Sequence, residues 1–122
     1  MRTRLAFILV SMLLLTITAA GCYSSEDSKD PDITGLIFSI EGNRVLIVSD
    51  IEDAAIDYDD WFMAGHRAIF FTVTDKSVIE TGSEKGSFDD LVVGLRVEAW
   101  ADGPLAESYP EQGTAKKIII LK

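Results

Sequence analysis

From residue 33 onward, short apolar runs alternate with polar turns in a pattern that predicts β-strands. The stretch "ITGLIFSIEGNRVLIVSD" (33–50) has two runs rich in Val, Ile, Leu and Phe around a Glu-Gly-Asn turn, which is typical of a tight hairpin. Three further runs occupy 67–80, 87–100 and 114–122, and polar residues at 74–77 interrupt the first of them. No amphipathic helical pattern of about ten or more residues accompanies these runs. The chain is therefore predicted to be all-β.

The predicted strands are enough for a small closed barrel. Apolar residues occupy every second position from Val93 to Ala99, which gives that run one apolar face. Just before it, Ser87 precedes the acid Asp90 by three residues, a spacing that favours a single capped helical turn. About five strands at this length bury their core most easily by closing into a barrel, which also protects the strand edges. The predicted core residues are Phe38, Val45, Ile47, Phe71, Val73, Val97 and Ile118.

The first 21 residues have the layout of a secretory signal peptide. Arg2 and Arg4 precede an almost unbroken apolar run over 5–17, which is short for a membrane-spanning helix. The following "AAGC" (19–22) resembles the lipobox of bacterial lipoproteins, in which leucine is usual where this chain has Ala19. The resemblance implies cleavage before Cys22, the only cysteine of the chain, and a diacylglycerol on its thiol. The alternative is an ordinary secreted protein with a free cysteine near its new N-terminus.

A domain organisation follows from this interpretation. Residues 1–21 are the predicted signal peptide, 22–32 are the lipidated Cys22 and a flexible acidic tether, and 33–122 are the β-barrel domain. The tether sequence "YSSEDSKDPD" (23–32) has no apolar periodicity, as expected of a solvated linker. Without a second cysteine the domain has no internal disulfide, and the lone thiol is best explained as an attachment point to the cell membrane on its extracytoplasmic face.

The net charge of the mature chain argues against partners that carry many negative charges. Removal of residues 1–21 takes Arg2 and Arg4 from the 11 basic residues and none of the 20 acidic ones, so the mature chain carries a net charge of −11. Such a domain is repelled by phosphate backbones and by anionic headgroups. No glycine-rich phosphate loop and no basic patch interleaved with aromatics offsets this. A nucleic-acid partner is therefore not expected.

Several motifs of the barrel region resemble a known family. The chain has Gly35 ahead of the hairpin, then "TDKSVI" (74–79), "FDDLVVGLRVEAW" (88–100) and "GPLAESYPEQGTAKKI" (103–118). Together they resemble the YobA-like family of small Gram-positive lipoproteins, built on a domain of unknown function, in which Thr is usual at the position of Ser77. The resemblance covers nearly all of the mature chain. It implies a small five-stranded OB-like barrel, and it implies no catalytic residues because the family has no established activity.

The residues that most often carry chemistry are sparse. His66 is the only histidine, and a hydrolytic triad needs a positioned nucleophile and acid beside it. Six carboxylates lie in "SDIEDAAIDYDDWF" (49–62), but they lack the spacing of an EF-hand loop, so a solvated acidic loop or short helix is the prediction. Asp89 and Asp90 are interpreted as a helix-start acid pair. We therefore predict no catalytic residues, no metal ligands, no cofactor and no enzymatic activity.

A binding role remains the best-supported hypothesis from the sequence. The predicted contact residues for a protein or small ligand are Tyr58, Trp61, Glu107, Ser108 and Tyr109. Aromatic side chains framed by polar ones are typical of binding hot spots, although the same aromatics can also pack into the core. The alternatives are a structural lipoprotein of the envelope and an enzyme that works with a carboxylate pair such as Asp57 and Asp60.

Overall fold

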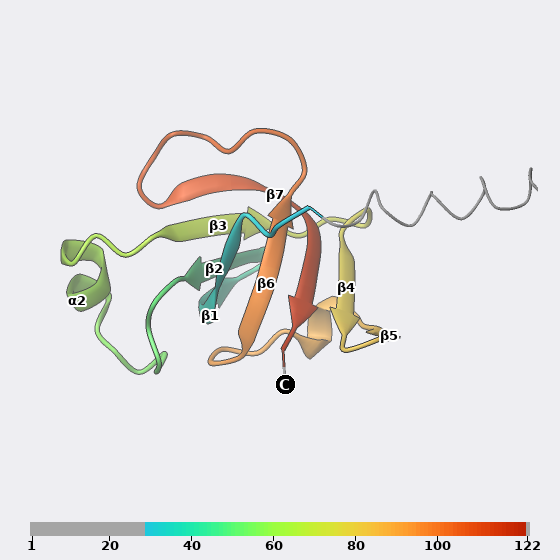
Figure 1. Cartoon of the computed structure of the whole chain (residues 1–122), viewed down its shortest axis with the longest axis horizontal. Helices are drawn as coiled ribbons and strands as arrows, with labels where there is room; N and C mark the ends of the chain where they lie inside the picture. The colour runs from blue at the N-terminus through green and yellow to red at the C-terminus, as the bar shows by residue number, and fades with distance from the viewer. Residues whose placement is uncertain (1–28, 122) are drawn as a thin grey trace, which may run out of the picture. The chain divides into compact units, whose positions relative to one another are not determined.

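Residues 29–121 are described by the computed structural model of the chain, and Pro31 begins the compact unit that holds every strand (Figure 1). The elements in chain order are β1 (Ile33–Glu41), β2 (Arg44–Val48), α2 (Tyr58–Met63), β3 (Ala68–Thr72), β4 (Val78–Thr81), β5 (Glu84–Lys85), the 3-10 turn η2 (Phe88–Asp90), β6 (Arg96–Ala101) and β7 (Glu111–Ile120). The predicted signal peptide, Cys22 and most of the predicted tether lie outside the described residues. No helix within 29–121 is long and apolar enough to cross a bilayer.

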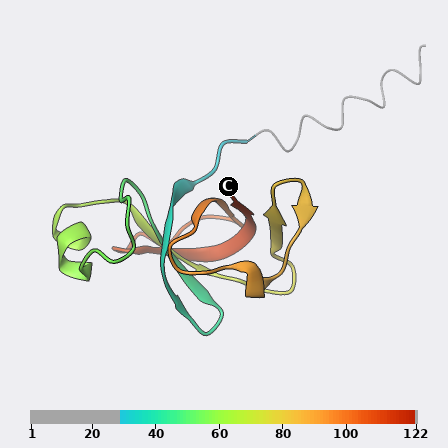
Figure 2. The same ribbon diagram turned by 90° about the horizontal axis from the view of Figure 1, so that it is seen from below.

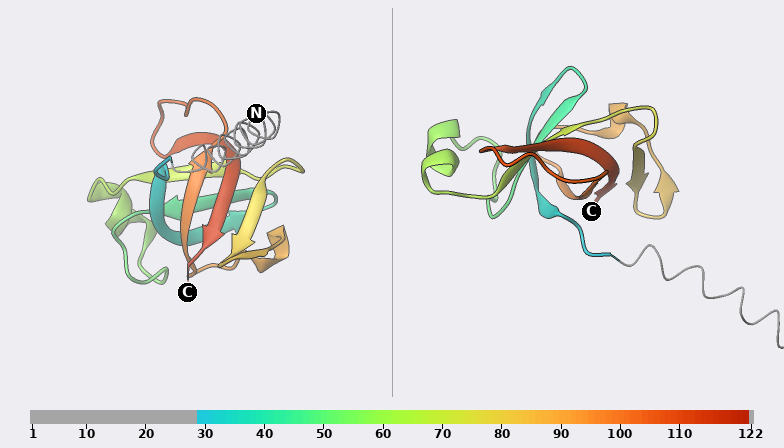
Figure 3. Two further views of the ribbon diagram at one scale, coloured as in Figure 1. Left: turned by 45° about the vertical axis from the view of Figure 1, so that its right-hand side comes forward. Right: turned by 90° about the horizontal axis from the view of Figure 1, so that it is seen from above.

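Five of the strands close into a barrel. The sheet order is β3-β2-β1-β6-β7, and β3 then pairs with β7, which joins the two ends. This last pairing is parallel, with Ile69 opposite Glu111, whereas the other four neighbours in the ring are antiparallel. Figure 3 shows the strands crossing at a steep angle, as in a small closed barrel. The predicted all-β, five-stranded OB-like barrel is confirmed.

One edge of β7 pairs with two strands in succession. Its first half pairs with β3, and its second half pairs in parallel with β4, where Val78 lies opposite Lys117. The short strand β5 then pairs with β4 and ends the sheet. The sequence pattern at 67–80, interrupted by polar residues, therefore marks two strands that lie end to end along β7. Figure 2 shows the β4–β5 hairpin on one side of the barrel and α2 on the other.

The barrel interior is filled by branched aliphatic and aromatic side chains. Six of the seven predicted core residues belong to it: Val45, Ile47, Phe71, Val97 and Ile118 are fully buried, and Val73 is nearly so. Their alternation along the strands sends every second side chain inward, as the pleat requires. Burial of this kind stabilises a fold by about 25 cal/mol for each Å² of apolar surface removed from water.

Phe38 is the exception among the predicted core residues. A β-bulge interrupts the pairing of β1 with β2, because Ile37 lies opposite Ile47 but Ser39 lies opposite Leu46. Before the bulge, Ile33 and Ile37 point into the barrel and Leu36 points out of it, so Phe38 points outward by the regular alternation. The extra residue then reverses the alternation, and Ile40 packs against the barrel core. Phe38 instead packs on the outside of the barrel, and its prediction as a barrel core residue is wrong.

The segment before β6 also differs from its prediction in part. The predicted capped turn is present as η2, where the Ser87 amide donates to Asp90 Oδ2 at 2.8 Å and a capping box forms. The apolar face was predicted to begin at Val93. However, Val93 is 49% exposed, and β6 begins only at Arg96. Gly94 has a φ of 97° and donates its amide to the Ile37 carbonyl, so the chain turns there into β6.

A second apolar cluster lies on the outside of the barrel. Its buried members are Leu36, Leu46, Val48, Ile51, Trp61 and Ala68. The connection between β2 and β3 crosses this outer face, and its short helix α2 places Trp61 against it. The predicted acidic loop or short helix is present as α2, with Trp61 buried and Phe62 partly buried against the cluster. This cluster fixes α2 on the barrel and so positions the residues considered next.

Candidate binding surface

Trp61 is the anchor of α2. Its side chain is fully buried and meets Phe38 edge to face, with ring centroids 5.4 Å apart. Its indole Nε1 is the one buried side-chain nitrogen or oxygen between residues 29 and 121 that lacks a hydrogen-bond partner. The sequence predicted Trp61 as a contact residue, but a fully buried ring cannot touch a ligand in this conformation. Trp61 therefore supports the surface from beneath.

Three aromatic rings form a continuous stack above Trp61. Tyr58 and Phe62 are stacked with centroids 5.2 Å apart, and Phe62 meets Tyr109 at 4.8 Å. Tyr58 and Tyr109 also contact Trp61 edge to face at 4.7 and 6.5 Å. Tyr58 and Phe62 are one helical turn apart on α2, which places both rings on the same side of the helix. The fold thus joins α2 to the β6–β7 connection, 40 residues or more away in sequence.

Part of this stack is open to solvent. Tyr58 is 45% exposed, Tyr109 is 43% exposed, and Met63 at the end of α2 is 81% exposed. The two tyrosine rings pack against Phe62, and Met63 is exposed next to Phe62 in the chain. Exposed apolar side chains gathered on a small domain often mark interaction sites. We call these residues, with the exposed acids Asp57, Asp59 and Asp60 and the half-buried Phe62, the aromatic–acidic surface.

Backbone contacts hold Tyr109 in place. Its hydroxyl donates to the His66 carbonyl, and the Phe62 carbonyl lies 3.4 Å from the same oxygen. The Tyr109–Pro110 peptide bond is cis. In turn, His66 Nδ1 lies 3.0 Å from the Ser49 carbonyl, an arrangement in which Nδ1 carries the proton and donates it. The sole histidine therefore connects the two ends of the β2–β3 connection.

The environment of Tyr109 changes its acidity. Partial burial raises the pKa of the Tyr109 phenol above its ordinary value of 10.0, and the neighbouring Tyr58 phenol adds to this rise. The neutral phenol is therefore favoured, and it is the form that donates to His66. A folded-state pKa above the unfolded one means that the folded state retains the proton longer as pH rises.

We expect the stability contributed by this phenol to be present below about pH 10 and to be lost as pH rises through the Tyr109 pKa. The Tyr109→Phe variant should unfold with a weaker pH dependence above about pH 10 than the parent, because the titrating hydroxyl is absent. Urea denaturation at a series of alkaline pH values measures this difference. If the free energy of unfolding falls equally steeply with pH in the parent and in Tyr109→Phe, the role given to the Tyr109 hydroxyl is contradicted. Tyr58→Phe serves as the comparison variant.

The structure brings together some of the predicted contact residues and separates others. Tyr58 and Tyr109 lie in the stack, as described, with Trp61 below them. Glu107 and Ser108 are exposed in the β6–β7 connection, where Ser108 Oγ donates to the Pro110 carbonyl at 2.7 Å. That bond gives Ser108 a local role in the turn. Phe62 and Met63 were not among the predicted residues, although the spacing of four residues between Tyr58 and Phe62 on one short helix was a usable signal for Phe62.

The charges around this surface are of one sign. Residues 49–66 contain six carboxylates and no Lys or Arg. The two ion pairs found between residues 30 and 121 are Arg67–Glu111 at 3.1 Å and Lys117–Glu80 at 3.9 Å, and neither involves these six. Within the described part of the chain, no three acidic, histidine or cysteine side chains lie together as a metal site would require. None of these six acids therefore has an ion-pair partner among residues 30–121.

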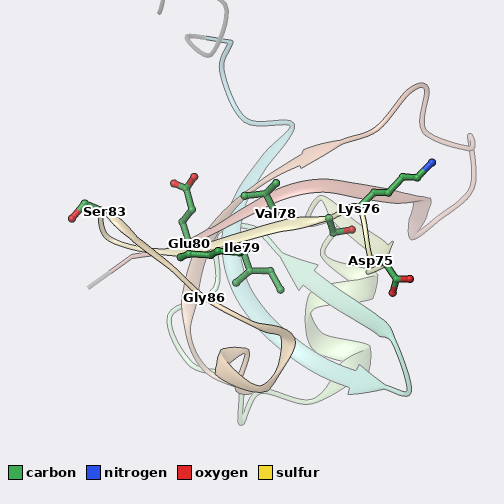
Figure 4. Close-up of a pocket in the computed structure, with 9 residues that line it drawn as sticks. Asp75, Lys76, Val78, Ile79, Glu80, Ser83 and Gly86 are labelled. Carbon is green, nitrogen blue, oxygen red and sulfur yellow. The ribbon is translucent and has the colours of Figure 1, made fainter.

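A separate depression lies on the opposite side of the barrel. It has a volume of about 430 Å³ and is lined by the 75–80 segment together with Ser83, Lys85 and Gly86. Figure 4 shows that the charged side chains of Lys76 and Glu80 point away from one another, while Ile79 points toward the fold. Both signs of charge are present and do not converge on one point. The aromatic–acidic surface is therefore the stronger candidate site.

The position of α2 also bears on what the barrel can bind. OB-like barrels commonly bind oligonucleotides and oligosaccharides on the face of their second and third strands, between the loops that follow the first and fourth strands. Here the outer side chains of those strands, including Leu46 and Val48, belong to the cluster covered by Trp61. The barrel strand order and this covered face define the class of protein: a small OB-like domain with a helix packed over its outer surface.

Comparison with known proteins agrees with that class. Residues 34–122 match the family described as "Protein of unknown function (DUF3221)", and the chain belongs to this family. The chain is also similar to the yobA protein of Bacillus subtilis in its crystal structure, with 19% sequence identity and a TM-score of 0.51 over 78% of this chain and 98% of that one. This likeness shows the fold. No curated protein matches the chain.

Proposed function

We propose that the chain is an extracytoplasmic lipoprotein, anchored to the membrane through Cys22, whose barrel binds a partner through the aromatic–acidic surface. The observation that carries the binding role is the stack of Tyr58, Phe62 and Tyr109, in which both tyrosines are exposed and a buried tryptophan lies beneath. The partner is a protein or a small ligand, and no enzymatic activity is proposed.

The place of the stack on the barrel supports this proposal. Tyr109 lies in the connection between β6 and β7, which corresponds to the loop between the fourth and fifth strands of an OB barrel. That loop is one of the two that commonly contact ligands in such barrels. The fold alone does not establish a function, so the argument depends on the aromatic residues that this chain places there.

The membrane anchor has a direct test. In cells that express the full chain, Cys22→Ala is expected to lose membrane retention or to accumulate as an uncut precursor, because the thiol that carries both acyl chains is missing. Ser24→Ala is the matched control and should stay in the membrane fraction at its mature size. A Cys22→Ala protein that keeps mature size and partitions into detergent like the parent would contradict the anchor.

The binding role can be tested in the same cells with a photo-crosslinker. p-Benzoylphenylalanine at position 63 replaces a side chain that is 81% exposed beside the stack, so irradiation is expected to give a discrete adduct. The same group at position 78, which is 45% exposed on β4, is the control and should give none. The adduct at 63 should disappear when Tyr109→Ala is combined with it. Equal adducts at both positions, or none at 63, would contradict a binding role for this surface.

A further inference from the structure

The acids of the aromatic–acidic surface form no ion pair with residues 30–121. Asp57, Asp59 and Asp60 are all exposed. They lie at the start of α2, the helix that also carries Tyr58 and Phe62. Three more carboxylates precede them in the β2–β3 connection at positions 50, 52 and 53. None of the ion pairs formed between residues 30 and 121 reaches this group. Like charges held this close repel one another, and a cationic partner lowers that repulsion while an anionic one increases it.

The apolar part of the surface narrows the choice of partner. Tyr58 and Tyr109 both pack against Phe62, so the apolar area left open to a partner consists of the exposed parts of the two tyrosines and the Met63 side chain. Such an area packs against aliphatic stems and apolar side chains and does not enclose a small cation. Lys and Arg carry such stems beneath their charged groups.

The domain already uses such a pairing elsewhere. The guanidinium of Arg44 lies 4.3 Å from the centroid of Phe70, on the outer face of the barrel. A guanidinium over an aromatic face is attracted by the negative potential of that face. Phe70 packs against the same outer cluster that includes Trp61. At the stack, an arginine from another molecule finds apolar surface for its stem and carboxylates for its charge.

We propose that the aromatic–acidic surface binds a cationic polypeptide segment of a partner protein, one in which Lys and Arg alternate with apolar side chains. This inference rests on the binding role proposed above and specifies its partner. A second copy of the chain presents the same acids and is disfavoured by repulsion, as is an anionic phospholipid surface. The acids steer the segment to the surface, and the stack supplies the apolar contact that holds it.

The test uses the full chain purified in a non-ionic detergent and synthetic peptides as probes. The first peptide alternates Arg with Leu and Trp, the second has Glu in place of each Arg, and the third alternates Lys with Gly. The first is expected to bind, with a Kd that rises by tenfold or more, about 1.4 kcal/mol per tenfold, when the salt concentration is raised from low to high. The Glu peptide is expected not to bind, and the Lys-Gly peptide to bind at least about tenfold more weakly because it lacks apolar side chains.

Two matched pairs of variants locate the site. Met63→Lys places a positive charge in the surface and is expected to weaken binding of the Arg peptide about tenfold, while Val78→Lys, which adds the same charge on the far side of the barrel, should change it little. The triple variant Asp57→Asn, Asp59→Asn and Asp60→Asn should weaken binding further. Its control removes the same charge from Asp75, Glu84 and Asp89, which are exposed near the β4–β5 hairpin.

Several results would overturn the proposal. These are tight binding of the Glu peptide, equal binding of the Lys-Gly peptide, equal effects of the paired variants, or binding of phosphatidylglycerol vesicles in place of the Arg peptide. Because Met63 is so exposed, its variant is expected to keep the parent circular dichroism spectrum, and it decides the matter even where the triple variant fails to fold. An adduct at position 63 in cells without any binding of the Arg peptide would leave the binding role in place and show this choice of partner to be wrong.

Discussion

Replacement of Trp61 by alanine is expected to lower the free energy of unfolding by about 3–5 kcal/mol, the usual range for loss of a buried tryptophan. The side chain is fully buried and joins the outer cluster on the barrel to the exposed stack. For a domain of this size each kcal/mol corresponds to about 4–8 °C of melting temperature. Thermal unfolding followed by circular dichroism measures the loss.

The Trp61→Phe variant is the control for this prediction. It keeps an aromatic ring against Phe38 and removes the indole nitrogen that lacks a partner, and an unsatisfied buried group of that kind costs about 1–3 kcal/mol. We therefore expect Trp61→Phe to lose less than half as much stability as Trp61→Ala. A Trp61→Ala protein that melts within about 4 °C of the parent would show that α2 contributes little to the fold.

Replacement of Gly35 by alanine is expected to be comparably damaging, for a different reason. A Cβ on Gly35 would lie 2.2 Å from the Val48 carbonyl oxygen and 2.7 Å from its carbon, both of which belong to the backbone of β2. The backbone of β2 pairs with a strand on each side, so it cannot move aside as a side chain can. We expect a loss of about 3 kcal/mol or more, at or above the upper end of the usual cost of overpacking.

A second glycine of the barrel provides the comparison. A Cβ on Gly113 in β7 would meet Leu105 Cδ2 at 2.6 Å, which is the far end of a flexible side chain in a half-buried position. Gly113→Ala should therefore cost clearly less than Gly35→Ala in urea denaturation. Equal losses for the two variants would indicate that the damage comes from the loss of glycine itself and not from the contact between β1 and β2.

Local patterns in the sequence were sufficient to predict most of the fold. The hairpin around Gly42, the capped turn at Ser87 and the alternating apolar positions of β2 and β3 all depend on residues close in the chain. Closed barrels are a natural outcome for several short strands with one apolar face each. The bulge at Phe38 could not be predicted, because the apolar residues on both sides of it suit an unbroken strand equally well.

The candidate site was predictable only in part. Tyr58 and Tyr109 were selected because they are aromatic residues among acids, and the fold does place them in one stack. Composition alone could not separate Trp61, which is buried, from Tyr58, which is exposed one helical turn away. That distinction depends on which side of α2 faces the barrel, and this is decided by the outer cluster contributed by other strands.

The three-way pairing of β7 has a consequence for how the protein folds. Residues 111–120 pair with β3, β4 and β6, so neither the ring of five strands nor the β4–β5 extension is complete without them. The pairs β1–β2 and β2–β3 join strands that are neighbours in sequence and can form early, but the barrel stays open until β7 joins them. Contacts between residues so far apart in sequence form slowly, since the intervening chain must first be ordered. The chain is thus open to proteolysis and to misassembly until β7 has paired with the other strands.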